Sequence, residues 1–461
     1  MTLKSILVVF ITFISSCLHA QTLDSVFKVE KIDIIGNRRT KSSIILRELT
    51  FAEGDTILNW KYHAEQSRKQ LINLFLFNEI KLSHDSGIVK VIVTERWYLW
   101  PIPILDYADR NFNQWWLTKD PKRLIYGVDL AWYNIRGRNE TMVLNLVMGY
   151  TKSVGLSYKI PFFNQKKTWG VQLKALANTN REVWYDTKED KVQFFNDRDR
   201  ELIRREMGEL IFTHRKKFFS YHNFYTGYRR YRVSDTVVSD DVNRAYLLYG
   251  RTQQKEFYLG YQYVFDKRDY KGYPLSGHLL KVNGEFSNFF LPVKDFTTLL
   301  FKAAYSRYFP IKGRFYGAVH GTARWYSNNY PQYTHIQALG YGKDYIRGYE
   351  LSVIDGSHFG LGKAELKYRF LSKTYKFLEQ VRNYETAPFS LYLTAFFDAG
   401  YAINFNHKNS VMTTNTLPNS LQNGGGIGLN VVMFYDYCMR VEYSADRYFN
   451  RRFYLSFVAS M

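Results

Sequence analysis

The sequence predicts a small N-terminal α+β domain followed by a C-terminal transmembrane β-barrel of about 16 antiparallel strands. Three observations predict this fold class. Aromatic residues make up 18% of the 461 residues, with 38 Tyr and 35 Phe, which suits the aromatic girdles of a barrel. No apolar run after the N-terminal segment approaches the roughly 18 residues that a helical membrane span needs. From about Trp97 onward, apolar residues recur at every second position, as expected of strands that face lipid on one side.

The first 20 residues have the features of a cleaved signal peptide. Lys4 provides a positive charge, Ile6–Ile14 is an apolar run too short to span a bilayer as a helix, and Ala20 is a small residue before the cleavage site. Cleavage there would leave Gln21 as the first residue of the mature protein. We therefore expect residues 1–20 to be removed and the rest of the chain to be exported.

The two cysteines leave one alternative open. Ile14–Cys17 also resembles the cleavage box of a lipoprotein, in which Cys17 would be acylated and become the first residue. Simple cleavage after Ala20 is the preferred interpretation. It leaves Cys438 as the one thiol of the exported chain, so we expect no internal disulfide.

The chain is strongly basic. It carries 63 Lys and Arg against 42 Asp and Glu, which gives a formal net charge of +21. Such a charge can serve nucleic-acid binding, but export argues against nucleic acid as a partner. Contact with anionic head groups of membrane lipids is the expected use of this charge, and solubility of the loops is the alternative.

Residues 21–96 form the first expected domain. The pattern predicts a strand within Val26–Ile35, a short helix, and a second helix from about Asn59. A strand that carries Ile80 and Leu82 follows, and a tight turn joins it to a last strand. The order of strand, helix, helix, strand and strand describes an α+β domain.

This order and two segments of the domain resemble a single POTRA domain. The segments are Ile34–Thr40, near the start, and Leu74–Ile80, at the end of the second helix. The resemblance implies an exposed strand edge, here the strand of Ile80 and Leu82, that can pair with an extended peptide. The alternative is a periplasmic spacer that binds nothing.

Residues 97–461 form the second expected domain, the outer-membrane β-barrel. About 360 residues, at about 22 per strand and connection, predict close to 16 strands. A soluble β-sandwich is the competing interpretation, but its outward positions would be Lys, Thr and Glu rather than large apolar residues. The alternation is clear in one central strand, at Phe257, Leu259, Tyr261, Tyr263 and Phe265, and in the last strand, at Phe453, Leu455, Phe457, Ala459 and Met461.

The segment Gly340–Glu350 has the glycines of a loop that is held in one conformation, and it lies in a long connection between strands. Alternation places Glu365 and Asp398 on the inner faces of two adjacent later strands. We expect Arg347 to pair with these carboxylates inside the barrel, because guanidinium geometry suits bidentate contact. The alternative is that all three residues are separate lumen charges.

Several motifs resemble the outer-membrane assembly superfamily that includes BamA, TamA and the two-partner secretion transporters. Ile346–Tyr349 matches the family's Val/Ile-Arg-Gly-Phe/Tyr loop motif, and Phe396–Gly400 loosely matches its Phe-x-Asp-x-Gly strand motif. Other resemblances are a turn motif at Asp266–Asp269 with Pro274 and Gly277, and a glycine-rich late strand at Gly424–Gly428. The resemblance covers nearly all of the exported chain.

The resemblance implies a 16-stranded barrel in the outer membrane, with the POTRA domain in the periplasm. It implies a loop lock in the lumen, formed by Arg347, Gly348 and Tyr349 with carboxylates on neighbouring strands. It also implies a lateral seam between the first and last barrel strands. The expected seam residues of the last strand are Phe453, Leu455, Phe457 and Met461. A single POTRA-like domain departs from the several domains of the essential assembly protein, which argues against a principal assembly role.

The expected function is assistance in inserting outer-membrane proteins, or in translocating a polypeptide across the outer membrane. The expected partners are membrane lipids, unfolded or secreted polypeptide clients and accessory lipoproteins, and no cofactor is expected. A passive pore or a lipid-handling barrel of the same fold is the alternative. An outer-membrane hydrolase is a third candidate, but none of the histidines that would serve it, His278, His320, His335 and His358, lies in a nucleophile motif.

Overall fold

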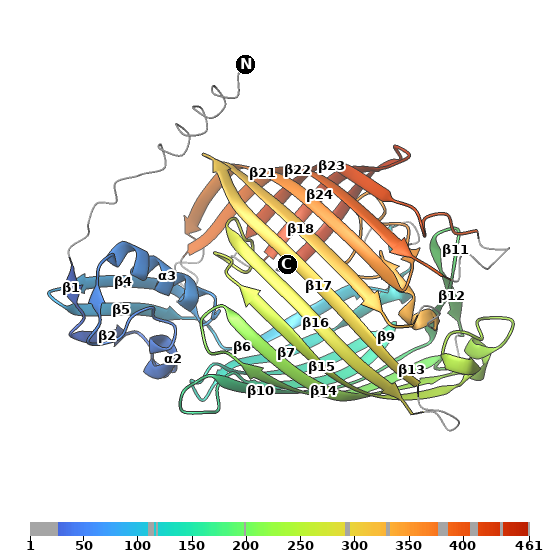
Figure 1. Ribbon diagram of the computed structural model, residues 1–461, viewed down its shortest axis with the longest axis horizontal. Coiled ribbons are helices and arrows are strands. Elements are labelled where there is room, and N and C mark those ends of the chain that lie inside the picture. The colour runs from blue at the N-terminus through green and yellow to red at the C-terminus, as the bar shows by residue number, and fades with distance from the viewer. Residues whose placement is uncertain are drawn as a thin grey trace, which may run out of the picture.

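The computed structural model describes residues 26–459, with gaps at 109–114, 117–118, 198–199, 291–295, 329–331, 377–385, 406–413 and 434–436. The expected signal peptide, Cys17 and Met461 lie outside the described residues. The chain forms a small N-terminal α/β domain beside one end of a large barrel-shaped sheet (Figure 1). This arrangement confirms the fold class that the sequence predicts.

The N-terminal domain has a three-stranded sheet covered by two helices. The strand order is β2-β5-β4, with β5 parallel to β2 and antiparallel to β4. Every second residue of β5 is a buried valine, because one face of this sheet packs on the helices. The elements are β1 (Phe27–Lys28), β2 (Lys31–Ile35), α2 (Ser42–Leu46), β3 (Thr56–Ile57), α3 (Trp60–Ile72), β4 (Phe77–Asp85) and β5 (Ile88–Glu95).

The second domain is a sheet of 16 strands in which each strand pairs antiparallel with its neighbours, so the expected strand count is confirmed. In chain order its strands are β6 (Leu99–Tyr107), β7 (Leu124–Ile135), β8 (Glu140–Gly149), β9 (Thr151–Ile160), β10 (Trp169–Asn180), β13 (Ile203–His214), β14 (Ser220–Val233), β15 (Gln253–Asp266), β16 (Gly277–Phe289), β17 (Phe296–Lys312), β18 (Phe315–Tyr326), β21 (His358–Lys376), β22 (Thr386–Ile403), β23 (Gln422–Met433), β24 (Tyr437–Asp446) and β25 (Arg451–Ala459).

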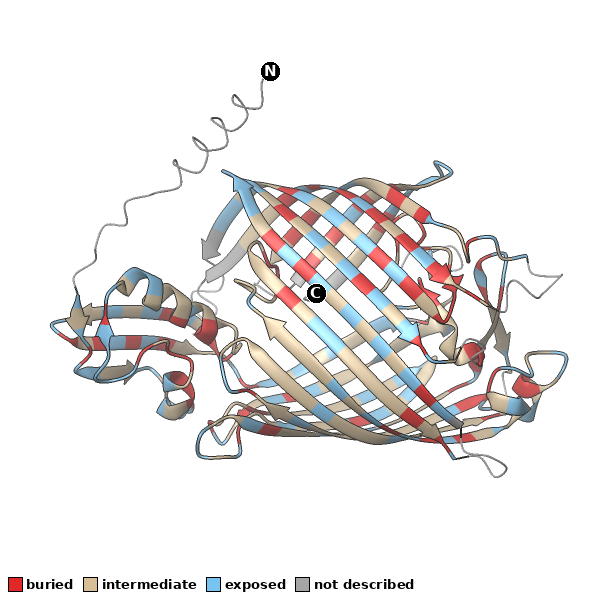
Figure 2. Ribbon diagram, in the orientation of Figure 1, coloured by how far each residue is buried: buried red, intermediate tan, exposed pale blue. Residues whose placement is uncertain are grey.

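Exposure alternates along these strands, as the bands in Figure 2 show. On β22, Leu393 and Phe397 are exposed, whereas Tyr392, Phe396 and Asp398 are buried. An apolar outer face and a more polar inner face are what a lipid-facing barrel requires. Within the described part of the chain, none of the helices has the length and apolarity that a membrane crossing requires.

The two ends of the barrel differ. At one end, called the turn end here, short connections meet the N-terminal domain; at the other, the loop end, long connections carry further small elements (Figure 1). These loops bury a common apolar cluster that includes Val183, Leu202, Val237 and Tyr333. The loop elements are η1 (Pro121–Arg123), β11 (Glu182–Lys188), β12 (Lys191–Asn196), η2 (Asp235–Val238), η3 (Leu248–Gly250), η4 (Tyr333–His335), β19 (Gln337–Leu339) and β20 (Ile354–Asp355).

Candidate functional site

The loop between β18 and β21 brings Arg347 to the inner face of β22. The guanidinium of Arg347 donates two hydrogen bonds to Asp398, from Nε to Oδ2 at 2.9 Å and from Nη2 to Oδ1 at 2.7 Å. The backbone N–H of Arg347 donates a third, at 3.0 Å to Oδ2. The side chains of Arg347 and Asp398 are 5% and 0% exposed. The bidentate pair and the backbone bond together fix both the side chain and the main chain of the loop.

Glycines on both sides let the loop backbone approach the strands. Gly348 has a φ of +100°, and a Cβ atom there would lie 2.8 Å from the carbonyl oxygen of Ala445. A Cβ atom on Gly424 of β23 would lie 2.1 Å from the carbonyl oxygen of Arg347. At this position of the glycine-rich start of β23, a larger residue would therefore clash with the loop backbone. Beside it, the Tyr349 hydroxyl donates to Gln422 Oε1 at 3.0 Å.

The second carboxylate near Arg347 is not the one that the sequence led us to expect. Glu442 on β24 lies 3.6 Å from Nη1 of Arg347, whereas Glu365 lies 3.8 Å from Lys367 and accepts a hydrogen bond from Asn430 at 3.5 Å. The register explains the difference, because Lys363 and not Glu365 stands opposite Asp398 on the paired strand. Because side chains alternate between the inner and outer faces along β24, the sequence could have indicated Glu442 as an inward carboxylate and a possible partner of Arg347.

A turn enters the lumen from the opposite end. The β15–β16 turn, residues 267–276, places Tyr273 inside the barrel, where its hydroxyl accepts a hydrogen bond from Asn430 at 2.9 Å. The ring of Tyr273 packs on Tyr392 of β22 with a centroid distance of 4.8 Å, and the Lys367 ammonium lies 4.4 Å from its centroid. The lumen is therefore occupied by the Arg347 loop from one end and by this turn from the other.

The same turn contacts the N-terminal domain. Asn73, which follows α3, accepts a hydrogen bond from the Lys271 N–H at 3.2 Å. A second junction is the ion pair between Glu48 and Arg215 of the β13–β14 turn, with N–O distances of 2.6 and 2.8 Å. The side chains of Glu48 and Arg215 are 1% and 7% exposed. These contacts attach the N-terminal domain to the turn end of the barrel.

The domain presents β4 as an edge strand. Among the described residues β4 pairs with one strand, β5, and its Ile80 side chain is buried while Leu82 is partly exposed. An open groove of about 640 Å³ runs along α3 beside Leu82 and is lined by Trp60, Tyr62 and Arg68. The structure thus places the two expected edge residues on a strand whose second edge has no neighbouring strand among the described residues.

The first and last barrel strands also have one neighbour each among the described residues. β6 pairs with β7, and β25 pairs with β24. The exposed side chains along these strands include Leu99, Leu105 and Phe453, at 59%, 78% and 73% exposure. Of the other expected seam residues, Leu455 and the backbone of Phe457 lie on β25. The boundary between β6 and β25 is called the seam below.

Comparisons with known proteins agree with this architecture. A family model described as the Omp85 superfamily domain matches residues 134–433. The crystal structure of BamA from Haemophilus ducreyi lacking POTRA domains 1–3 is similar, with a TM-score of 0.55 and 15% identity over 94% of this chain and 84% of that chain. CdiB from Escherichia coli has a TM-score of 0.52 and 15% identity over 93% of this chain and 75% of that chain. A comparison with curated proteins finds no match.

Proposed function

Because the chain belongs to the Omp85 superfamily of outer-membrane β-barrels, we propose that it assists the insertion of outer-membrane proteins or the passage of a polypeptide across the outer membrane. Insertion and secretion are the roles that the family supports. The observation that carries the proposal is the seam, where the strand order of the barrel begins and ends. The N-terminal domain is proposed to lie in the periplasm.

In this proposal the protein handles an extended chain without covalent chemistry. The edge of β4 and the groove beside α3 receive the chain by strand addition. The seam then offers an edge in the membrane, where unpaired backbone groups are costly and pairing is therefore favoured. The attachment of the N-terminal domain through Glu48 and Arg215 keeps the first edge close to the barrel.

The geometry favours this function over the two alternatives. A passive pore needs an open lumen, whereas Arg347 and Tyr273 occupy it from both ends. For a hydrolase, two Ser–His pairs come within 2.7 Å, Ser306 with His320 and Ser357 with its sequence neighbour His358. The second ring nitrogen of His320 contacts the hydroxyl of Thr322 at 2.7 Å, where a hydrolase would place a carboxylate. We therefore propose a non-enzymatic role.

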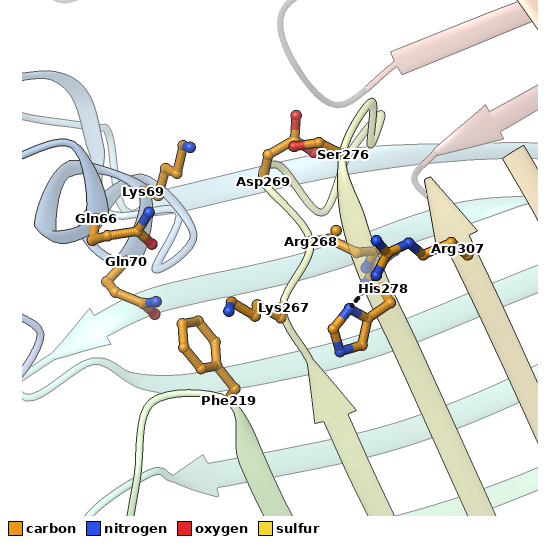
Figure 3. Close-up of a pocket in the computed structure, with 11 residues that line it drawn as sticks. Gln66, Lys69, Gln70, Phe219, Lys267, Arg268, Asp269, Ser276, His278 and Arg307 are labelled. Carbon is orange, nitrogen blue, oxygen red and sulfur yellow. Dashed lines mark hydrogen bonds between the residues drawn. The ribbon is translucent and has the colours of Figure 1, made fainter. Parts of the chain in front are cut away.

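Anionic lipid head groups are the proposed lipid partner, and a basic cleft at the turn end supports this. The cleft of about 270 Å³ lies between α3 and the outer wall of the barrel, where Lys267 and Arg307 are exposed (Figure 3). Arg307 donates to His278 at 3.4 Å, and the His278 ring stacks on Phe265 at 5.2 Å. Cationic groups beside outward aromatic rings suit the head-group level of a bilayer.

The test of the function is depletion of the protein in its native cell, followed by quantitative comparison of outer-membrane and secreted proteins. Selective loss of one barrel or one secreted protein is expected, and it would identify the client. An Arg347 variant that still folds, supplied as the only copy, should reproduce the loss. An unchanged protein profile with altered permeability or lipid composition would instead support the pore or lipid alternative.

A further inference from the structure

The hydrogen bonds that flank β6 show which of its backbone groups face the seam. The Tyr98 carbonyl accepts from the Tyr133 N–H at 2.7 Å, and the Ala108 N–H donates to the Arg123 carbonyl at 2.7 Å. The pairing between these two points has no register shift. In an antiparallel pair, residues that bond to the same neighbour recur at every second position. The backbone N–H and C=O groups of even-numbered residues of β6 therefore point toward β7. Those of odd-numbered residues point toward the seam.

Two of the seam-facing positions are prolines. Pro101 and Pro103 have odd numbers, so their backbone nitrogens, which carry no hydrogen, lie on the seam side. No donor faces the seam between Leu99 and Leu105, a stretch of about 20 Å at the rise of a β-strand. A strand added there would leave carbonyl oxygens without donors in lipid, which is costly. Prolines on an edge strand are a known means of preventing strand addition.

The strand on the other side of the seam, β25, contains no proline. The Asp446 N–H donates to the Asn450 carbonyl at 3.3 Å, so even-numbered residues of β25 face β24, and residues such as Arg451 and Phe453 turn their backbone groups toward the seam. No proline occurs from Arg451 to Ala459. Each residue of β25 therefore carries a backbone N–H group.

We propose that an extended polypeptide taken up at the seam pairs with β25, and that the proline edge of β6 prevents strand addition on its side. This inference rests on the proposed function, since it assigns the edge at which that function occurs. The partner is a strand with apolar residues at alternate positions, because one face of a strand at this place meets lipid. Because of Pro101 and Pro103, strand addition at the seam occurs on β25 and not on β6.

The test uses site-specific photo-crosslinking in the full-length protein, reconstituted in vesicles of phosphatidylethanolamine and phosphatidylglycerol. The probe is a labelled synthetic peptide with the sequence of β15, an amphipathic barrel strand of this protein. Crosslinkers replace Arg451 or Phe453 on β25, and Leu99 or Leu105 on β6. We expect crosslinking from the β25 positions to exceed that from the β6 positions at least fivefold.

Restoring the backbone N–H groups at positions 101 and 103 should remove the difference in crosslinking between β25 and β6. In the double variant Pro101→Val and Pro103→Val, crosslinking from Leu99 and Leu105 is expected to rise to the level of β25, and Pro101→Val alone should give part of the rise. Pro310→Val on β17, which lies away from the seam, is the control and should change nothing. Heat-dependent gel mobility confirms that each variant is folded.

Two results would overturn the inference in distinguishable ways. Equal or stronger crosslinking from β6 in the unmodified protein, or no rise in the folded proline variants, contradicts the assignment to β25 and leaves the proposed function intact. No crosslinking from either edge, in the unmodified protein and in the variants, contradicts both the assignment and strand addition at the seam.

Discussion

Arg347 shows how one residue can hold a loop of the barrel. Its guanidinium lies 3.9 Å from the centroid of the Phe396 ring and is desolvated beside Asp398 and Glu442. Burial acts to lower the pKa of Arg347, but the hydrogen bonds to Asp398 and the nearby carboxylates raise it above its ordinary value, so the side chain stays charged. A desolvated charge of this kind is stable only while its partner is present.

Charge reversal at this pair tests the lock. Arg347→Glu or Asp398→Arg should each destabilise the docked loop by about 3–5 kcal/mol, because each leaves like charges buried together. The double reversal should recover part of the loss. The rate of proteolysis within the loop of the folded protein measures docking. Reversing the exposed pair of Arg244 and Asp240 is the control, since exposed pairs contribute about 0–1 kcal/mol. Single reversals that are cleaved at the wild-type rate would contradict the lock.

Glu350 gives the same loop a dependence on pH. Burial, with a contribution from Glu442, raises the pKa of Glu350 from its ordinary value of 4.5 to about 8. Because the folded state holds this proton more tightly, its contribution to stability is complete below about pH 4.5 and is lost as the pH rises through about 8. Docking of the loop should therefore weaken over this range.

Glu350→Gln should remove this dependence. The amide oxygen can still accept the hydrogen bond from the Gly348 N–H, which measures 2.9 Å to the carboxylate, and no ionisation is left at this position. Proteolysis of the loop between pH 5 and pH 8.5, measured for both proteins with a protease corrected for its own pH profile, gives the comparison. Parallel pH curves for wild type and variant would show that Glu350 does not titrate in this way.

At the scale of elements, alternation along a strand is a local property and could be predicted from the sequence. It placed Asp398 inward and Phe397 outward on β22, as the structure has them. Which inward residues meet depends on register and on loops that fold into the lumen. Glu442 and Tyr273 were missed for this reason, since their partners, Arg347 and Asn430, lie far away in the sequence.

The junction between the domains was also beyond sequence reasoning. Glu48 and Arg215 are 167 residues apart, and each is an ordinary charged residue in its own segment. Only the docking of the turn after α2 on the β13–β14 turn makes them a buried pair. The POTRA-like order of elements and the glycines of the lock, by contrast, depend on local backbone requirements that are visible in the sequence.

Breaking this junction should release the N-terminal domain. Glu48→Gln leaves Arg215 buried without a carboxylate, which is expected to cost about 3–5 kcal/mol of docking free energy. Hydrogen exchange of α2 and of the β13–β14 turn should increase, with the domain itself still folded. Glu65→Gln on α3 is the control, because it breaks a surface pair in which Glu65 is 44% and Arg68 is 47% exposed. Unchanged exchange at the turn would mean that the pair does not hold the domain.

The basic cleft between α3 and the barrel wall is proposed to bind anionic lipid, and this binding can be measured. The double variant Lys267→Glu and Arg307→Glu should weaken binding of phosphatidylglycerol by roughly 2 kcal/mol, or about thirtyfold, at about 1 kcal/mol per basic residue. Native mass spectrometry of the detergent-solubilised protein counts the bound lipid. Lys28→Glu with Lys90→Glu, exposed on the N-terminal domain, changes the net charge equally and is the control. Equal lipid retention in both double variants would contradict a head-group site.

For the whole molecule, the two segments that enter the lumen separate the proposed function from a passive pore. The Arg347 loop and the Tyr273 turn come from opposite ends, and both contact strands β21 to β24. That wall of the barrel lies next to β25 and therefore to the seam. We therefore expect the loop and the turn to hinder ion flow through the lumen.

Conductance of the purified protein in planar bilayers tests this arrangement. Wild type should show rare, brief openings, because both closures must be absent for a continuous path. Deletion of residues 341–351 combined with Tyr273→Ala should give steady channels, and either change alone should give an intermediate result. Thermal gel shifts establish that each variant remains a folded barrel. Steady conductance of the wild type, equal to that of the combined variant, would mean that loop and turn do not close the lumen, and the passive pore would then become the better account of the protein.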